Sequence, residues 1–144
     1  MATVYLKEDE HVARQVPFSC QVRSEGDGGE VVGITHNAFR LKANEDYLSV
    51  AWLEFFQGEF DQQLNMAVRQ IHSVRPGKVS TGYWAASIGH MRAALRNHPF
   101  RASHEPVGEF TSHSALRRWP VDDELLLLLS ESIMAELHFL GQKS

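Results

Sequence analysis

Hydrophobic and polar residues alternate in the first third of the chain, which is the pattern of a half-buried β-strand. Where the alternation is clearest, every second position is apolar: Val16, Phe18, Cys20 and Val22. Pro17 marks an edge or a break, because proline cannot donate a hydrogen bond to a neighbouring strand. The glycine-rich residues 24–30 then predict a surface turn. We therefore expect extended segments, separated by breaks, over residues 12–41.

The aromatic-rich segment at residues 44–57 leaves two interpretations open. Asn44 can cap a helix that has acidic residues in its first turn. Alternatively, Tyr47–Val50 forms a strand and the helix begins after it. Periodicity cannot decide between a helix and a strand in so short a run. In both cases the aromatic side chains belong to the core, and we expect a helix near residues 50–57.

Two further segments have the periodicity of helices. Residues 61–74 place apolar side chains at spacings of three and four, and Pro76-Gly77 then ends the pattern. Residues 122–140 follow Pro120, begin with acidic residues and contain the apolar run Leu125–Leu129. Because this run is apolar nearly all round, we expect the helix either to be buried on several sides or to meet a partner.

These patterns together predict an α+β fold. The expected architecture is a small, mainly antiparallel sheet from residues 12–41, 79–88 and 100–117, packed by helices near 50–57, 61–74 and 122–140. Strands and helices do not alternate regularly, which argues against a doubly wound parallel sheet. The chain has no repeats or linkers, and its 144 residues are a common size for one domain, so we expect a single domain over residues 1–144.

Composition and charge mainly exclude classes of protein. The formal net charge is −4, which argues against general nucleic-acid binding. The one cysteine, Cys20, cannot form an internal disulfide, so the chain is typical of a cytosolic protein. Cys20 is most simply a small core residue, with a catalytic thiol as the alternative. There is no signal-peptide pattern and no apolar run near the ~20 residues of a membrane helix. We expect a soluble, cytoplasmic protein without membrane association, and no cofactor is indicated.

The segment at residues 97–119 concentrates polar side chains that can do chemistry, including three of the eight histidines. It contains no standard motif. His104-Glu105 is followed by Pro106, which breaks the helix that a zinc-binding His-Glu-x-x-His motif requires. A metal site at His104 and His113 has no evident third ligand beyond Glu105 or Glu109, so we expect no metal.

Two sets of residues are the candidates for a site: His36, His104 and His113 for catalysis, and Arg14, Arg40 and Arg101 for ligand binding. Histidine suits acid–base chemistry because its unperturbed pKa is about 6.5. The planar guanidinium group of arginine can donate two parallel hydrogen bonds, which suits a phosphate or a carboxylate. With a turn at Gly108, His104 and His113 are expected to face each other across a hairpin. A structural or solvated role is the alternative for each histidine.

Five short segments carry a resemblance to other proteins: Arg14-Gln15-Val16, Asn37-Ala38-Phe39-Arg40, Leu48-Ser49-Val50, His104-Glu105-Pro106 and Ser112-His113-Ser114-Ala115. In this order they resemble a group of short uncharacterised bacterial proteins. That group tends to have Asp-Pro and Ala-His-Ala where this chain has Glu-Pro and Ser-His-Ser. The resemblance spans Arg14 to about Leu116 and implies a bacterial cytosolic protein, but it carries no activity with it.

Two functions of different classes are consistent with the sequence. The lack of a catalytic motif and the apolar C-terminal helix favour a non-enzymatic binding or accessory module. Such a module would act through a homodimer or a protein partner near Leu125–Phe139. The alternative is a small enzyme or ligand-binding domain for a phosphorylated or nucleotide-like ligand, which uses His104 and His113 together with the arginines.

Overall fold

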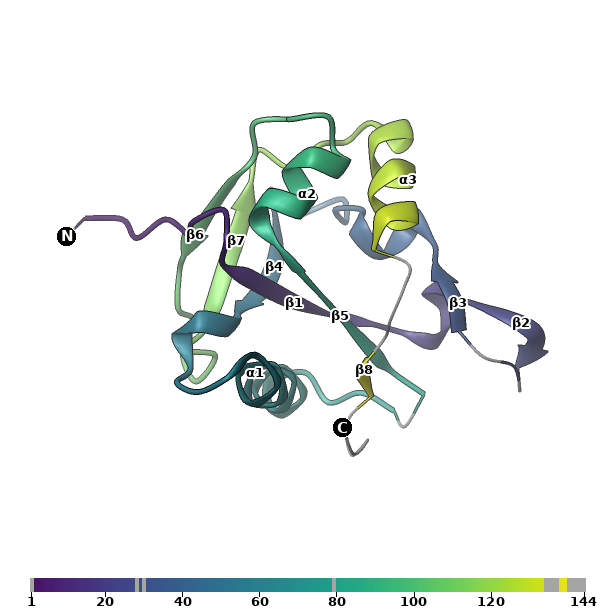
Figure 1. Cartoon of the computed structure of the whole chain (residues 1–144), viewed down its shortest axis with the longest axis horizontal. Helices are drawn as coiled ribbons and strands as arrows, with labels where there is room; N and C mark the ends of the chain where they lie inside the picture. Colours follow the sequence, from purple (N-terminus) through teal and green to yellow (C-terminus); the bar gives the residue numbers. More distant parts are fainter. Residues whose placement is uncertain (1, 28, 30, 79, 134–137, 140–144) are drawn as a thin grey trace.

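The computed structural model describes residues 2–27, 29, 31–78, 80–133 and 138–139 (Figure 1). A six-stranded sheet in the order β6-β7-β4-β1-β5-β8 forms its centre, and neighbouring strands are antiparallel throughout. Its strands are β1 (His11–Val16), β4 (Tyr47–Trp52), β5 (Gly82–Ser87), β6 (Arg101–His104), β7 (His113–Arg117) and β8 (His138–Phe139). A separate hairpin of β2 (Gln21–Asp27) and β3 (Val31–Ile34) projects from one end. The predicted α+β class is confirmed.

Helices cover both faces of the sheet. The helix α1 (Phe60–Val74) lies on one face, and α2 (Ile88–Ala94) and α3 (Asp123–Ser132) lie on the other (Figure 1). Three short 3₁₀ helices complete the elements: η1 (Phe18–Cys20), η2 (His36–Phe39) and η3 (Leu53–Phe55). The predicted helix at residues 61–74 is confirmed as α1. It begins with a capping box, in which the side chains of Glu59 and Gln62 each accept from the other residue's backbone.

The alternation of side chains along β1 divides the core into two parts. Val12 and Val16 point toward α2 and α3, whereas Ala13 points toward α1. On the first side the helices contribute fully buried residues such as Met91 and Leu126. The side chains of a strand point to opposite faces in turn, and β1 has buried apolar residues on both faces, so a layer of helix is needed on each side of the sheet. None of the helices in the described part of the chain is long and apolar enough to cross a membrane.

Two of the predicted helices are wrong in part. The segment near residues 50–57 is the strand β4 followed by the single turn η3, so the strand interpretation is the correct one. Pairing along the whole of β7 buries the alternate residues of β4, and this tertiary pairing decides the conformation of a segment whose local pattern is ambiguous. The C-terminal helix ends at Ser132 instead of Leu140, because His138–Phe139 pairs with the edge of β5 as strand β8. Leu140 itself lies outside the described residues.

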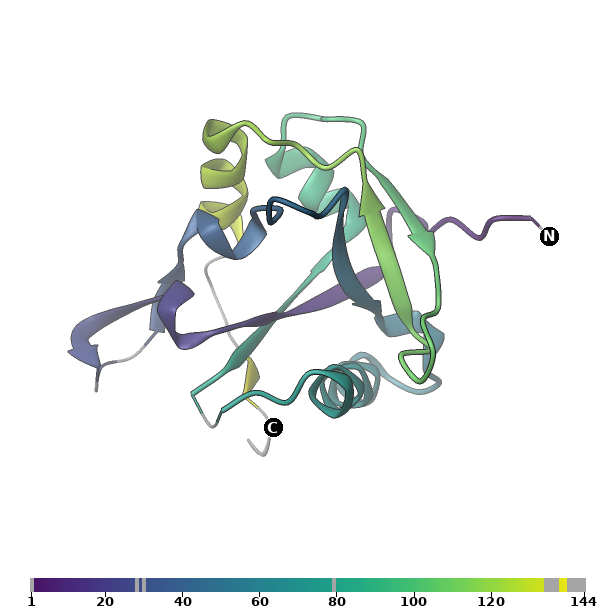
Figure 2. The ribbon, with the colours of Figure 1, turned by 180° about the vertical axis from the view of Figure 1, so that it is seen from behind.

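The strands β1 and β4 separate after only two residue pairs. Val12 pairs with Trp52 and Ala13 pairs with Ala51, and the ladder between these strands stops there. Beyond that point β1 stays paired with β5, and β4 stays paired with β7. Figure 2 shows the two strands diverging from each other. The sheet therefore opens into a fork at its middle, and the fork places backbone and side-chain polar groups along a gap.

Candidate functional site

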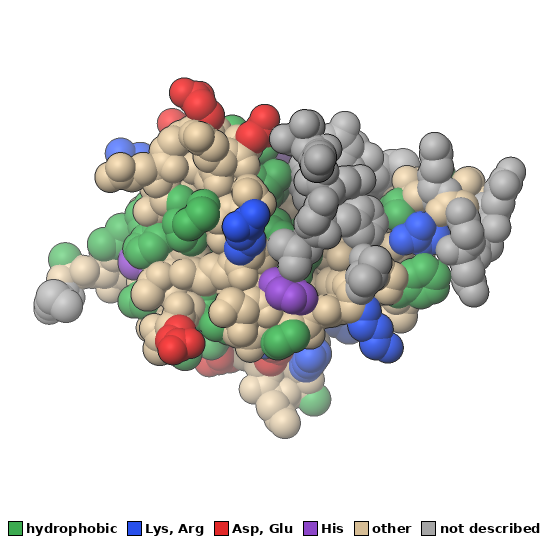
Figure 3. Space-filling view, turned by 90° about the horizontal axis from the view of Figure 1, so that it is seen from below, with side chains coloured by type: hydrophobic (Ala, Val, Ile, Leu, Met, Phe, Trp, Pro, Cys, Tyr) green, Lys and Arg blue, Asp and Glu red, His purple; other side chains and the backbone are tan. Residues whose placement is uncertain are grey.

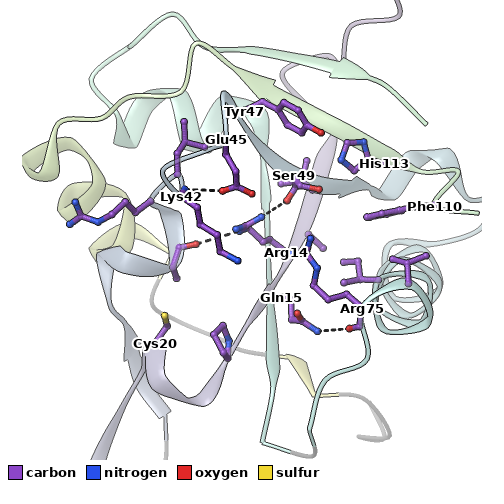
Figure 4. A pocket seen from close by; sticks show the side chains of 18 of the residues that line it. Arg14, Gln15, Cys20, Lys42, Glu45, Tyr47, Ser49, Arg75, Phe110 and His113 are labelled. Atoms are coloured by element: carbon purple, nitrogen blue, oxygen red, sulfur yellow. Dashed lines mark hydrogen bonds between the residues drawn. The ribbon is translucent and has the colours of Figure 1, made fainter. Parts of the chain in front are cut away.

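A pocket of about 990 Å³ lies at the fork between β1 and β4. Most of its lining comes from β1 at residues 13–15, the loop at residues 40–46, β4 at residues 47–50 and the end of α1 at residues 71–75. Pro17, Cys20, Asn37, Ala38 and Val107 complete the lining, together with two aromatic side chains. Phe110 and His113 close one side (Figure 4). The volume is at the upper end of the roughly 300–1,000 Å³ that is typical of small-molecule sites. A fork in a sheet is thus sufficient to build a site of ligand size in this small protein.

Arg14 lies in the middle of this pocket (Figure 4). Its Nη1 donates to the carbonyl oxygen of Ser49 at 2.7 Å, and its Nε donates to the carbonyl oxygen of Ala38 at 3.4 Å. The Ser49 bond crosses the gap, where a paired strand would otherwise satisfy the backbone. The guanidinium therefore bridges the two arms of the fork and also reaches η2, which fixes its position in the pocket.

The charge of Arg14 is not neutralised by an ion pair among the described residues. Burial lowers the pKa of Arg14 to about 10; the negative charge of Glu45 acts in the opposite direction, and the positive charge of Arg75 lowers the pKa further. Arg14 is still a cation at neutral pH. A cation that is partly removed from water and has no direct counter-charge is costly, and an incoming anion relieves that cost.

The remaining charged groups leave the pocket with a positive excess. Arg40 is paired with Asp123 at 2.8 Å, and Asp46 lies 3.8 Å from Arg117. Three cationic side chains without such a pair within the described chain also line the pocket, namely Arg14, Lys42 and Arg75. Glu45 is the carboxylate that opposes them, and it accepts the backbone N–H of Lys42 at 2.8 Å. Counted over the side chains that line the pocket, the four cations Arg14, Arg40, Lys42 and Arg75 exceed the two carboxylates Glu45 and Asp46 by two charges.

Aromatic rings form the wall of the pocket on the side of β7. His113 is 4% exposed, and its ring lies edge-on to Phe110 at 5.0 Å and to Tyr47 at 5.8 Å. Its Nδ1 lies 2.7 Å from the carbonyl oxygen of Glu105. A carbonyl can only accept a hydrogen bond, so Nδ1 carries the proton and Nε2 is the unprotonated nitrogen of the neutral ring. Nε2 has no hydrogen-bond partner in the described part of the chain.

The side chain of Glu105 holds this wall in place from behind. It makes a two-point ion pair with Arg117, with Nη2–Oε1 at 2.6 Å and Nε–Oε2 at 2.8 Å, and it also accepts from the hydroxyl of Ser103. The hydrogen bond with Arg117 is the main reason that the pKa of Glu105 is lowered to about 2. Arg117 in turn lies over the ring of Tyr47, 4.9 Å from its centroid. The ion pair thereby connects the hairpin of β6 and β7 to the aromatic wall.

His104 and His113 do not face each other across the hairpin of β6 and β7. His104 pairs with Ser114, which places its side chain on the face opposite to that of the adjacent His113. The ring of His104 lies against Trp52 at 5.1 Å, and its Nε2 lies 2.8 Å from the carbonyl oxygen of Thr111. The expectation that the two rings converge is wrong, because a shift of one residue in register moves a side chain to the other face.

The fork brings together three of the six candidate residues: Arg14, Arg40 and His113 line the pocket. His36, His104 and Arg101 do not line it. Arg101 is exposed on β6.

Sequence reasoning missed Lys42, Glu45 and Arg75, which come from a loop and a helix end. Arg14 was a candidate because a guanidinium suits a phosphate or a carboxylate, but His11 and Gln15 in the same strand are also polar, so the local pattern does not single it out. The loop residues also have no signal in the local pattern.

No described group of three His, Cys, Asp or Glu side chains is arranged to hold a metal ion. The chain matches no protein-family model, no curated protein and no solved structure. Its function is therefore inferred from the pocket itself.

Proposed function

We propose that this protein binds a small molecule carrying a phosphate group, and that the pocket at the fork of β1 and β4 is the binding site. The observation that carries the proposal is the environment of Arg14. Its guanidinium donates to two carbonyl oxygens and has no ion-pair partner among the described residues. Guanidinium groups match the geometry of phosphate oxygens, and a partly buried cation without an ion-pair partner favours an anion.

The charge balance supports a dianionic group over a monoanionic one. The pocket has two positive charges in excess, whereas the whole chain has a net charge of −4. The attraction for an anion is therefore local to the pocket. A phosphate monoester carries about −1.5 to −2 at pH 7, which is close to the excess.

Titration calorimetry with ribose 5-phosphate at low ionic strength tests this proposal. We expect binding to the wild-type protein, a loss of about tenfold in affinity for Arg75→Gln, and no measurable binding for Arg14→Met. Arg75 is exposed, so its replacement is expected to leave the fold intact. Arg69→Gln is the matched control, because Arg69 is an exposed arginine of α1 that does not line the pocket.

Absence of binding to the wild-type protein would reject the proposal. Equal binding by Arg14→Met and the wild type would also reject it, because the phosphate would then lie elsewhere. An equal loss of affinity for Arg69→Gln and Arg75→Gln would indicate general attraction to surface charge instead of a site.

A homodimer or a protein partner through the C-terminal helix remains a prediction. Within α3, the apolar side chains that suggested it are largely used within the protein, since Leu126 and Leu129 are fully buried, whereas Leu127 is 46% exposed. On the side that α1 covers, hydrophobic side chains form separate groups with charged side chains between them (Figure 3). The ligand pocket is the better-supported basis for function.

A further inference from the structure

We propose that the phosphorylated ligand also carries a planar ring with an N–H donor, and that His113 Nε2 accepts this donor. The ligand class is then a nucleoside monophosphate or a compound of the same chemistry. This inference rests on the proposed phosphate site, and it adds a second recognition point at the other side of the same pocket.

The protonation of His113 determines which chemistry it can recognise. The Glu105 carbonyl holds the proton on Nδ1, so the neutral ring has a lone pair on Nε2. His113 lines the pocket, and its Nε2 is not among the fully buried unpaired polar atoms of the described chain, so water can reach it and a ligand N–H can replace that water. A ligand that places an N–H at this atom gains a hydrogen bond, whereas a ligand that places a carbonyl oxygen there does not.

The shape of the aromatic wall favours a planar group next to His113. Phe110 and Tyr47 flank the imidazole, and both of their rings line the pocket (Figure 4). Arg117 lies over the Tyr47 ring and keeps it in place against β7. Aromatic side chains prefer offset-stacked or edge-to-face contacts with a flat ring, and base–aromatic contacts contribute to nucleotide binding in many proteins.

The two recognition points lie on different sides of one pocket. Figure 4 shows Arg14 in the middle, with Lys42 and Arg75 near it, and Tyr47, His113 and Phe110 together along the adjacent wall. A cavity of about 990 Å³ has room for a phosphate, a sugar and a base. The cationic part fits the phosphate, and the aromatic part fits the base.

The test compares the four nucleoside 5′-monophosphates AMP, GMP, CMP and UMP with ribose 5-phosphate by calorimetry. We expect at least one nucleotide to bind tenfold or more tightly than ribose 5-phosphate, which has the phosphate and the sugar but no base. In His113→Asn the side-chain amide can still donate to the Glu105 carbonyl, but the acceptor at Nε2 is absent. In this variant the ratio of nucleotide affinity to ribose 5-phosphate affinity should fall at least threefold.

A second measurement on the wild-type protein does not depend on how the variant folds. The ¹⁵N chemical shift of His113 Nε2 should move upfield when the preferred nucleotide binds and stay in place when ribose 5-phosphate binds. If ribose 5-phosphate binds as well as every nucleotide, this inference is overturned and the phosphate site stands. If the nucleotide advantage persists in His113→Asn and the Nε2 shift is unchanged, His113 is not the acceptor. If no phosphorylated probe binds, the phosphate site itself is rejected.

Discussion

Arg14 Nη1 donates a 2.7 Å hydrogen bond to the carbonyl oxygen of Ser49, across the gap where β1 and β4 have already separated. A side chain thus occupies a position where the backbone of an adjacent strand would normally pair. The same guanidinium is the cation to which we assign phosphate binding. Arg14 therefore has both a structural role, in its hydrogen bonds, and a proposed role in ligand binding. Its contribution to stability and its contribution to affinity can be measured separately.

Arg14→Met should remain folded, with a free energy of unfolding within about 1–2 kcal/mol of the wild type. Loss of the hydrogen bonds destabilises the protein, but removal of a partly buried cation without an ion pair offsets part of that loss. Arg14→Lys should be less stable than Arg14→Met, because it keeps the charge and loses the two-point contact. Urea unfolding followed by circular dichroism measures both. A loss of more than about 4 kcal/mol in the free energy of unfolding of Arg14→Met would indicate that the role of Arg14 is mainly structural.

The ion pair of Glu105 with Arg117 should make stability depend on acid pH. The pKa of Glu105 is lowered from 4.5 to about 2 in the folded protein, mainly by its hydrogen bond to Arg117. The contribution is therefore complete above about pH 5 and is lost as the pH falls toward 2. Because the carboxylate is 32% exposed, we expect a modest contribution of about 1 kcal/mol.

Urea unfolding of the wild type and Glu105→Gln at several pH values between 2 and 6 measures this contribution. The difference between the two proteins should be present at pH 6 and shrink toward pH 2. Glu109→Gln is the control, since Glu109 is exposed on the same hairpin. A difference that does not change with pH would contradict the assignment.

The hydrogen bond of the buried Trp119 indole should contribute to the free energy of unfolding, whereas the Trp84 indole makes no such contribution. Trp119 Nε1 donates to the carbonyl oxygen of Phe39 at 2.6 Å, whereas Trp84 Nε1 is buried without a partner in the described part of the protein. Replacement of either residue with phenylalanine removes similar volume. Only Trp119→Phe also leaves a backbone carbonyl without its donor, so it should cost about 1–2 kcal/mol more than Trp84→Phe in thermal or urea unfolding. Equal losses would contradict this account.

Gln70 connects α1 to the segment before β7. Its Oε1 accepts from the backbone N–H of Ser112 at 2.9 Å and also from the Ser112 hydroxyl, and Ser112 is fully buried. Gln70→Ala should cost about 1–3 kcal/mol in unfolding free energy, because both donors lose their acceptor. Asn65→Ala is the control on the exposed side of α1 and should be neutral or slightly stabilising, since alanine has the higher helix propensity.

Neighbouring leucines of α3 test whether this helix serves the core or a partner. Leu126 is fully buried, and Leu127 is 46% exposed. Leu126→Ala should cost about 2–5 kcal/mol, as is usual for a large core residue, and Leu127→Ala less than about 1 kcal/mol.

Light scattering of Leu127→Glu then tests the partner surface. If the wild-type protein is a dimer and Leu127→Glu is a monomer, α3 forms a dimer interface. If the wild-type protein is already a monomer, the predicted homodimer is wrong.

Local patterns were informative where one periodicity dominated. The apolar spacing of residues 61–74 predicted α1 to within one residue at its start. The alternation from Val16 to Val22 was only partly right, because Phe18 and Cys20 lie in η1 between the strands β1 and β2. They were ambiguous at residues 44–57, where the pairing of β4 with β7 decided for a strand. They were wrong about the C-terminal helix, because α3 ends at Ser132 and His138–Phe139 pairs with the edge of β5.

The histidine pair shows the same limit at the level of the site. The sequence indicated that His104 and His113 lie near a turn, but not which face each side chain occupies, because the face depends on the register of β6 and β7. Arg14 and His113, which are 99 positions apart, line one pocket only because β4 is paired with β7 and parted from β1.

The sequence by itself determined the α+β class and the position of α1. Periodicity and propensity act over a few neighbouring residues, and these features depend on nothing further. Only the tertiary structure decided that β1 and β4 form a fork and that Arg14 lies within it. It also placed Lys42, Arg75 and His113 around the same cavity. Strand pairing and register depend on contacts between distant segments, and a local pattern does not contain them.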